Sequence, residues 1–149
     1  MQKRFVIGID PAKGFAVYDR KTKKLENLIT TDFWGIIRNI DDYLSTGKLA
    51  HVYVEDPSQN KNIWIANKNS IRTDEARKMM KIARNVGENA RSGLLIIQYC
   101  DINQIPNTPM KPTKNSMTKL NAEMFYRITG WKKRSSEHSR DAAMLCWKR

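Results

Sequence analysis

Near-continuous apolar runs separated by short polar turns open the chain and predict strands. KRFVIGID at 3–10 is typical of a strand that is buried on both faces, and FAVYDR at 15–20 predicts a second strand. ENLITTDF at 26–33 follows the polar turn KTKK and predicts a third strand. Because the connections are short, we expect these three strands to form an antiparallel meander.

The hydrophobic period then changes to that of helices. From 33 to 44, apolar side chains recur at helical spacing behind Asp32, the predicted N-cap of a helix. AHVYVED at 50–56 predicts another central strand. TDEARKMMKIARNVGENA at 73–90 predicts a second helix, and we interpret the apolar run GLLIIQYC at 93–100 as a buried fifth strand.

The last third of the chain combines a loop with two predicted helices. Residues 101–115 contain three prolines and predict a loop. SMTKLNAEMFYRITG at 116–130 predicts an amphipathic helix that ends at Gly130. Ser136 is the predicted N-cap of a last helix, EHSRDAAMLCW.

Together these elements predict one α/β domain over residues 1–149. Its central mixed sheet has five strands, three antiparallel and then parallel ones, with helices on its flanks. The chain carries 27 Lys and Arg against 15 Asp and Glu, a formal net charge of +12. Such an excess predicts salt-sensitive binding to nucleic acid.

The expected location follows from features that the sequence lacks. No segment approaches the roughly 20 apolar residues of a membrane span, and no signal-peptide pattern opens the chain. Cys100 and Cys146 lack the spacing of metal ligands and predict two buried, reduced thiols. We therefore expect a cytoplasmic protein that does not enter a membrane.

Acidic residues end two of the predicted strands. Asp10 ends the first and Glu55 the fourth, so pairing of these strands would bring two carboxylates side by side. Carboxylates that close repel each other and normally need a cation between them. His138 and Asp141 share one face of the last helix, where an acid before an apolar stretch is costly unless it is paired or ligates a metal. Each residue alone has an ordinary role as a cap, turn or surface group, but the combination predicts a Mg²⁺ or Mn²⁺ site.

The order of the motifs GIDPAKGFAV, VYVEDP, ARNVGENA, KPTKNSMTKLNAEMF and HSRDAAML resembles the RuvC family of Holliday junction resolvases, and its compact phage-type members in particular. The resemblance covers roughly residues 4–147. It implies a ribonuclease H-like fold, a homodimer and paired metal-dependent nicks in branched DNA that leave 5′-phosphate and 3′-hydroxyl ends. The chain departs from the family at Ala12, where a glycine is usual, and by two additional acids, Asp56 and Glu137.

The resemblance also implies roles for individual residues. Asp10 and Glu55 correspond to the first two catalytic acids of the family, and Asp141 corresponds to the acid of its final helix. His138 occupies a position where members carry Asp or His. We expect Asp10 to bridge two Mg²⁺ ions, which Mn²⁺ can replace, with Glu55 on one ion and Asp141 on the other. His138 either ligates metal or acts as the base, and Lys119, on the first turns of its helix, stabilises the developing charge.

Further residues are predicted to contact branched DNA or a second subunit. Trp64, in the polar loop 57–72, is a candidate for stacking on an unpaired base or, alternatively, a hydrophobic anchor of the loop. Met79, Ile82 and Val86 share a face that either pairs two subunits or covers the sheet. The basic residues predicted to contact the DNA backbone are Lys111, Lys114, Lys119, Arg77, Lys81, Arg84, Lys132, Lys133 and Arg134. A solvated helix surface is the alternative for Lys119, Arg77, Lys81 and Arg84.

Other functions remain open at this point. A ribonuclease H-like nuclease that acts on flaps or RNA–DNA hybrids would carry the same acids, and a non-catalytic branched-DNA-binding module would keep the basic surface. An actin-like kinase or ATPase requires a second glycine-rich phosphate loop, which VYVEDPSQN lacks. A membrane-surface protein is disfavoured because the basic residues are interleaved with core periodicity.

Overall fold

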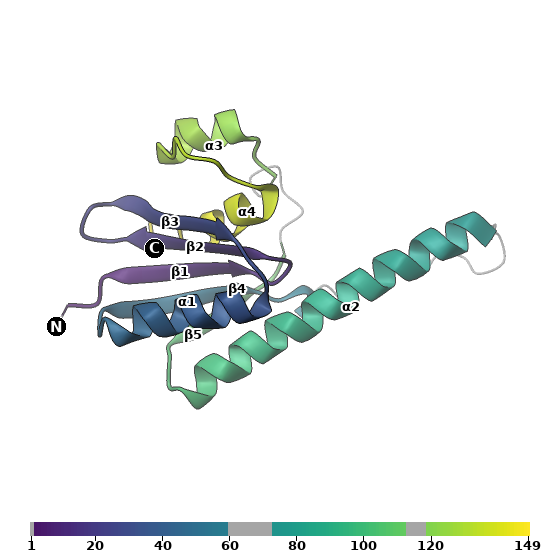
Figure 1. The fold of residues 1–149 in the computed structure, drawn as a ribbon, viewed down its shortest axis with the longest axis horizontal. Helices are drawn as coiled ribbons and strands as arrows, with labels where there is room; N and C mark the ends of the chain where they lie inside the picture. The colour runs from purple at the N-terminus through teal and green to yellow at the C-terminus, as the bar shows by residue number, and fades with distance from the viewer. Residues whose placement is uncertain (1, 60–72, 113–118) are drawn as a thin grey trace.

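The structure, a computed structural model, describes residues 2–59, 73–112 and 119–149. Its strands are β1 (Phe5–Asp10), β2 (Gly14–Asp19), β3 (Lys24–Thr30), β4 (Leu49–Glu55) and β5 (Asn107–Met110). They form one five-stranded sheet of order β3-β2-β1-β4-β5 (Figure 1). The β1–β2 and β2–β3 pairs are antiparallel, whereas the β1–β4 and β4–β5 pairs are parallel. The predicted mixed sheet of an α/β fold is therefore confirmed.

Helices cover both faces of this sheet. Within the described residues they are α1 (Phe33–Ser45), α2 (Thr73–Ile102), α3 (Ala122–Thr129), α4 (Glu137–Cys146) and the 3-10 helix η1 (Pro57–Gln59). The predicted caps are confirmed: Asp32 accepts a hydrogen bond from the Gly35 N–H at 2.7 Å, and Ser136 caps α4 through the Ser139 N–H at 3.1 Å. Gly130 ends α3 in the left-handed conformation.

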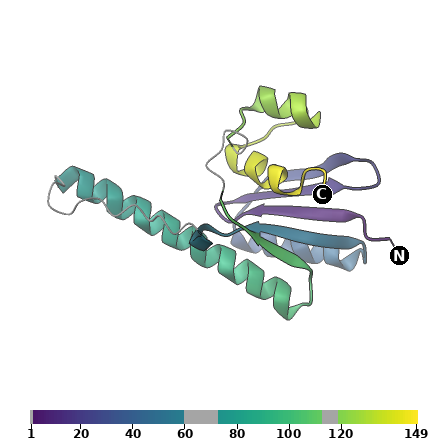
Figure 2. The same ribbon diagram turned by 180° about the vertical axis from the view of Figure 1, so that it is seen from behind.

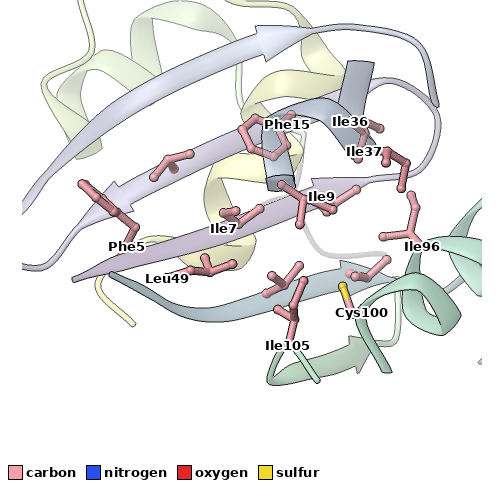
Figure 3. Packing of buried hydrophobic residues seen from close by; sticks show 14 residues of the cluster. Phe5, Ile7, Ile9, Phe15, Ile36, Ile37, Leu49, Ile96, Cys100 and Ile105 are labelled. Carbon is pink, nitrogen blue, oxygen red and sulfur yellow. The ribbon is translucent and has the colours of Figure 1, made fainter. Parts of the chain in front are cut away.

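Two apolar layers hold the helices on the sheet. On one face, Ile7 and Ile9 of β1 pack with Ile36 of α1 and Ile96 of α2, as Figure 3 shows. The other face packs against α3 and α4. Because side chains alternate along a strand, Val6, Gly8 and Asp10 face α4 while Ile7 and Ile9 face α1 and α2. The alternation thus puts the Asp10 carboxylate on the α4 side of the sheet.

The strand predicted at 93–100 is wrong, because these residues form the last turns of α2. Ile96 and Cys100 are fully buried, whereas Leu94 is 43% exposed, so one side of this apolar run faces the core at helical spacing. A short apolar run suits a buried strand and a buried helix equally well. The fifth strand is instead β5, within the segment predicted as a loop, and its exposed Pro109 fits an edge strand.

The helix predicted over 116–130 is shorter than expected. Asn121 caps α3 by accepting a hydrogen bond from the Met124 N–H at 2.8 Å. Phe125 is the buried apolar side chain of this helix, whereas Met124 and Ile128 are exposed. Residues 119–121 precede the helix, although Leu120 continues its apolar spacing, and residues 116–118 lie outside the described residues.

Helix α2 extends well beyond the sheet. Its N-terminal half points away from the rest of the chain in both views (Figures 1 and 2). Ile82 and Val86 lie on this half and are 62% and 40% exposed, so they do not cover the sheet. In the part of the chain that the structure describes, no helix combines the length and the apolar composition that a membrane span needs.

Candidate metal centre

Three elements bring the predicted acidic residues to one edge of the sheet. Asp10 ends β1 and Glu55 ends β4, and the parallel register pairs Ile9 with Val54, the residues just before them. Both carboxylates therefore project at the carboxyl ends of adjacent strands. The first two turns of α4, which packs on one face of the sheet, bring His138 and Asp141 to the same edge.

Two glycines let α4 lie directly on the sheet. A Cβ atom at Gly8 would lie 2.0 Å from the Ala142 carbonyl oxygen, and one at Gly14 would lie 1.9 Å from the His138 carbonyl oxygen. Both contacts involve backbone carbonyl oxygens, which cannot move aside as the end of a flexible side chain can. The close approach of α4 to β1 and β2 is therefore what carries His138 to the side of Asp10.

Asp10, His138 and Asp141 form a compact cluster. Each offers a ligand atom, and these atoms all lie within 4.8 Å of one another. The His138 Nδ1 atom lies 3.1 Å from the Asp10 Oδ2 atom, and the Ala12 N–H donates to Asp10 Oδ1 at 3.0 Å. Asp10 is buried, whereas the His138 side chain is 47% exposed. The cluster is thus open to solvent on the His138 side and could hold a metal ion.

The electrostatics of the site favour a bound cation. The Oδ1 atom of Asp141 is buried and has no hydrogen-bond partner among the described residues. Burial, followed by the charges of Asp10 and Glu137, raises the pKa of Asp141 to about 6. Burial, followed by the charges of Asp10 and Asp141, raises the pKa of Glu55 to about 7. A divalent cation would remove this repulsion and occupy the unpartnered oxygen, and the oxygen-rich ligand set fits a hard ion.

Glu55 stands apart from the compact cluster. It is half-buried and lies outside the group whose ligand atoms approach within 4.8 Å, yet it is close enough for Asp10 and Asp141 to shift its pKa. Of the two additional acids, Asp56 accepts hydrogen bonds from the Ser58 N–H and Oγ at 3.1 and 2.6 Å and so caps η1. Glu137 lies in the first turn of α4.

Two predicted lysines lie in segments attached to this edge of the sheet. Lys111 is exposed and directly follows β5, whose last residue pairs with Glu55. Lys119 is also exposed, but it precedes α3, so its predicted place on the first turns of a helix is wrong. The next residue, Leu120, accepts a hydrogen bond from the Arg140 Nε atom at 2.7 Å, which ties this segment to α4.

The other predicted DNA contacts are dispersed. The three on α2, on the half that points away from the sheet, are exposed: Arg77, Lys81 and Arg84. The three between α3 and α4 are exposed as well: Lys132, Lys133 and Arg134. Trp64 and Lys114 lie outside the described residues.

Two residues near the acidic edge were not predicted from the sequence. Lys13, in the β1–β2 turn, has a φ of 140°, in the region that favours glycine, and its carbonyl accepts from the Thr31 N–H at 2.9 Å. Trp34, in the first turn of α1, is 69% exposed. The position of Trp34 off the apolar face of the predicted helix could have indicated its exposure from the sequence. No local pattern indicated the backbone conformation of Lys13.

Comparisons of the chain with protein-family models, with curated proteins and with solved structures find no match. The candidate metal centre therefore rests on its own geometry and on the chemistry of its residues.

Proposed function

We propose that this protein is a metal-dependent endodeoxyribonuclease that resolves Holliday junctions and related branched DNA by paired nicks. The observation that carries the proposal is the convergence of Asp10, His138 and Asp141 around an unpartnered buried carboxylate oxygen, with Glu55 at the end of the adjacent strand. An antiparallel meander followed by parallel strands supports a ribonuclease H-like fold. The order of motifs that resembles the RuvC family supports the substrate.

In the proposed site, Asp10, Asp141 and His138 would hold one divalent ion, and Asp10 with Glu55 would hold a second. Divalent ions supply charge stabilisation at the phosphoryl group and orient the attacking water. Alternatively, the half-exposed His138 would leave this ion to the carboxylates, keep its contact with Asp10 and act as the base that accepts a proton from that water. The attack forms a P–O bond and breaks the bond to the 3′ oxygen, which takes a proton from solvent. Lys111 and Lys119 are candidates to stabilise the developing charge.

Paired nicking requires two sites, and a homodimer would supply them. The exposed Ile82 and Val86 on the extended half of α2 support pairing of this helix with a second copy. The net charge of +12 supports binding to DNA.

The proposal is tested by cleavage of a labelled four-way junction, with linear duplex, flap and RNA–DNA hybrid as controls, in Mg²⁺ or Mn²⁺. The variants are Asp10→Asn and, as a matched control, Asp56→Asn, which removes an acid that only caps η1. We expect symmetric nicks in the junction that are lost in Asp10→Asn and retained in Asp56→Asn.

Other results would change the conclusion in different ways. Preferential cleavage of flap or hybrid, lost in Asp10→Asn, would keep the hydrolytic centre and replace the substrate. Tight junction binding without cleavage in either metal would overturn the nuclease and favour a DNA-binding module.

A further inference from the structure

A basic hollow lies at the end of the sheet opposite to the metal centre. It has a volume of about 680 Å³ and is lined by Gln2, Lys3, Arg4, Arg20, Lys21 and Lys48. These residues come from the segments just before β1, just after β2 and just before β4. Strand β1 is six residues long, so its two ends lie about 17 Å apart at ~3.3 Å per residue. The basic hollow is therefore separate from the Asp10 cluster.

Backbone hydrogen bonds fix the three segments to one another. The Lys48 carbonyl accepts from the N–H groups of Arg4 at 2.7 Å and Phe5 at 3.0 Å. The Arg4 carbonyl accepts from the Arg20 N–H at 3.0 Å. The cations of the hollow are thus anchored at the ends of paired strands and do not depend on a long loop for their position.

Most of the positive charge in the hollow is uncompensated. Asp19 is the buried acid beneath it, and its carboxylate forms two hydrogen bonds with the Arg4 guanidinium, at 2.7 and 2.5 Å. That pair neutralises Arg4. The Arg20 Nε atom donates to the Arg149 main-chain oxygen at 2.9 Å. Among the residues that the structure describes, none forms a salt bridge with Lys3, Lys21 or Lys48.

We propose that the basic hollow binds the phosphate backbone of DNA at a site remote from the cleaved bond. The segments lie at the ends of three adjacent strands and span ~10 Å, at ~4.8 Å per strand. A DNA strand carries one charge per ~3.4 Å of helix axis, so the hollow can contact consecutive phosphates. The inference rests on the proposed function for the choice of DNA, and it adds a second contact that lies beyond the metal centre.

The test compares two variants with the same loss of charge. The hollow variant carries Arg20→Gln, Lys21→Gln and Lys48→Gln, and the control carries Arg38→Gln, Lys78→Gln and Arg91→Gln on α1 and α2. Binding of a four-way junction is measured without divalent metal over a range of salt concentrations. We expect the hollow variant to bind ~10-fold more weakly than the control, with a salt slope smaller by ~2. Thermal melts check that both variants are folded.

Equal losses of affinity in the two variants would overturn the proposal, since net charge alone would explain them. Reduced binding of a labelled mononucleotide with unchanged junction affinity would also overturn it, in favour of a free phosphate ligand. Because binding is measured without metal, a selective loss in the hollow variant supports the hollow even when the wild type cleaves no DNA. The two proposals can therefore fail separately.

Discussion

An acid with a buried carboxylate oxygen lies at each end of the β1–β2 pair, Asp19 on β2 and Asp141 on α4, and the two acids have opposite hydrogen-bonding environments. At the basic end, Asp19 accepts hydrogen bonds from the Arg4 guanidinium, the Lys21 N–H and the Thr22 hydroxyl. These bonds, those from Arg4 first, hold the pKa of Asp19 well below its usual range. At the other end, Asp141 leaves a buried oxygen without a partner, and its pKa is raised to about 6.

The difference distinguishes an acid with a structural role from a candidate metal ligand. Both acids have a buried carboxylate oxygen, so burial of the oxygen alone does not indicate a site. Buried polar groups are nearly always satisfied, and an acid that is surrounded by other acids and left unpaired needs an explanation outside the protein chain. A bound cation would provide that explanation at the Asp10 cluster, whereas Asp19 needs none.

The largest expected effect is that Asp141→Asn impairs cleavage but not stability, whereas Asp19→Asn impairs stability but not cleavage. Asp141→Asn should lower metal-dependent cleavage on the order of 10³-fold while leaving the metal-free protein at least as stable as the wild type, because it removes a repelled charge. Asp19→Asn should lower the free energy of unfolding by about 2 kcal/mol, since it weakens hydrogen bonds to a buried carboxylate, and should retain cleavage per folded molecule. Single-turnover cleavage and urea unfolding measure the two effects. Equal destabilisation by both variants would contradict the proposed difference between Asp141 and Asp19.

A smaller effect is expected from the glycine contacts that the acidic end requires. Gly14→Ala places a Cβ against the His138 carbonyl, so α4 must shift. We expect a loss of about 2 kcal/mol in unfolding free energy, and a fall in cleavage, because a displacement of ~1 Å costs ~10²-fold in rate.

The matched control for this substitution is Gly87→Ala, where an added Cβ meets nothing within 4 Å. Because alanine favours a helix interior, this change should raise stability by about 0.5–1 kcal/mol and leave cleavage unaltered. Unfolding and cleavage assays on both variants check the pair. A tolerated Gly14→Ala with full activity would show that the His138 position does not depend on this contact.

The smallest expected effect is in the pH dependence of stability without divalent metal. The pKa values of Glu55, about 7, and Asp141, about 6, exceed their ordinary values of 4.5 and 3.8, so the folded state binds more protons than the unfolded state. The free energy of unfolding therefore falls as the pH rises, by about 2 kcal/mol between pH 5 and 8 once partial solvent exposure is allowed for. Asp19 has the opposite sign, and its contribution is lost as the pH falls below about 4.

Urea unfolding in EDTA across this pH range measures the slope. Mg²⁺ should reduce the decline above pH 6, because a cation replaces the protons that the carboxylates release. Asp141→Asn provides the control, since it should remove part of the decline. Stability that increases steadily from pH 5 to 8 would contradict the raised pKa values.

Local sequence patterns determined four of the five strands, the caps Asp32 and Ser136, and the candidates Asp10, Glu55, His138 and Asp141. Each of these depends on neighbours along the chain, such as a strand period, a cap before a helix or an acid at the end of an apolar run. The sequence alone therefore indicated the residues of the candidate metal centre and the sheet edge that they share.

Tertiary contacts determined the elements that local sequence patterns left ambiguous and those for which the patterns gave no signal. The apolar run 93–100 became helix because α2 buries only one side of it, and β5 became a strand because β4 offered an edge for pairing. The basic hollow had no signal in the sequence. It forms because pairing of β1 with β2 and β4 brings together cations that lie up to 45 positions apart, from Lys3 to Lys48. Contacts between distant segments depend on the whole sheet, which no local window of sequence contains.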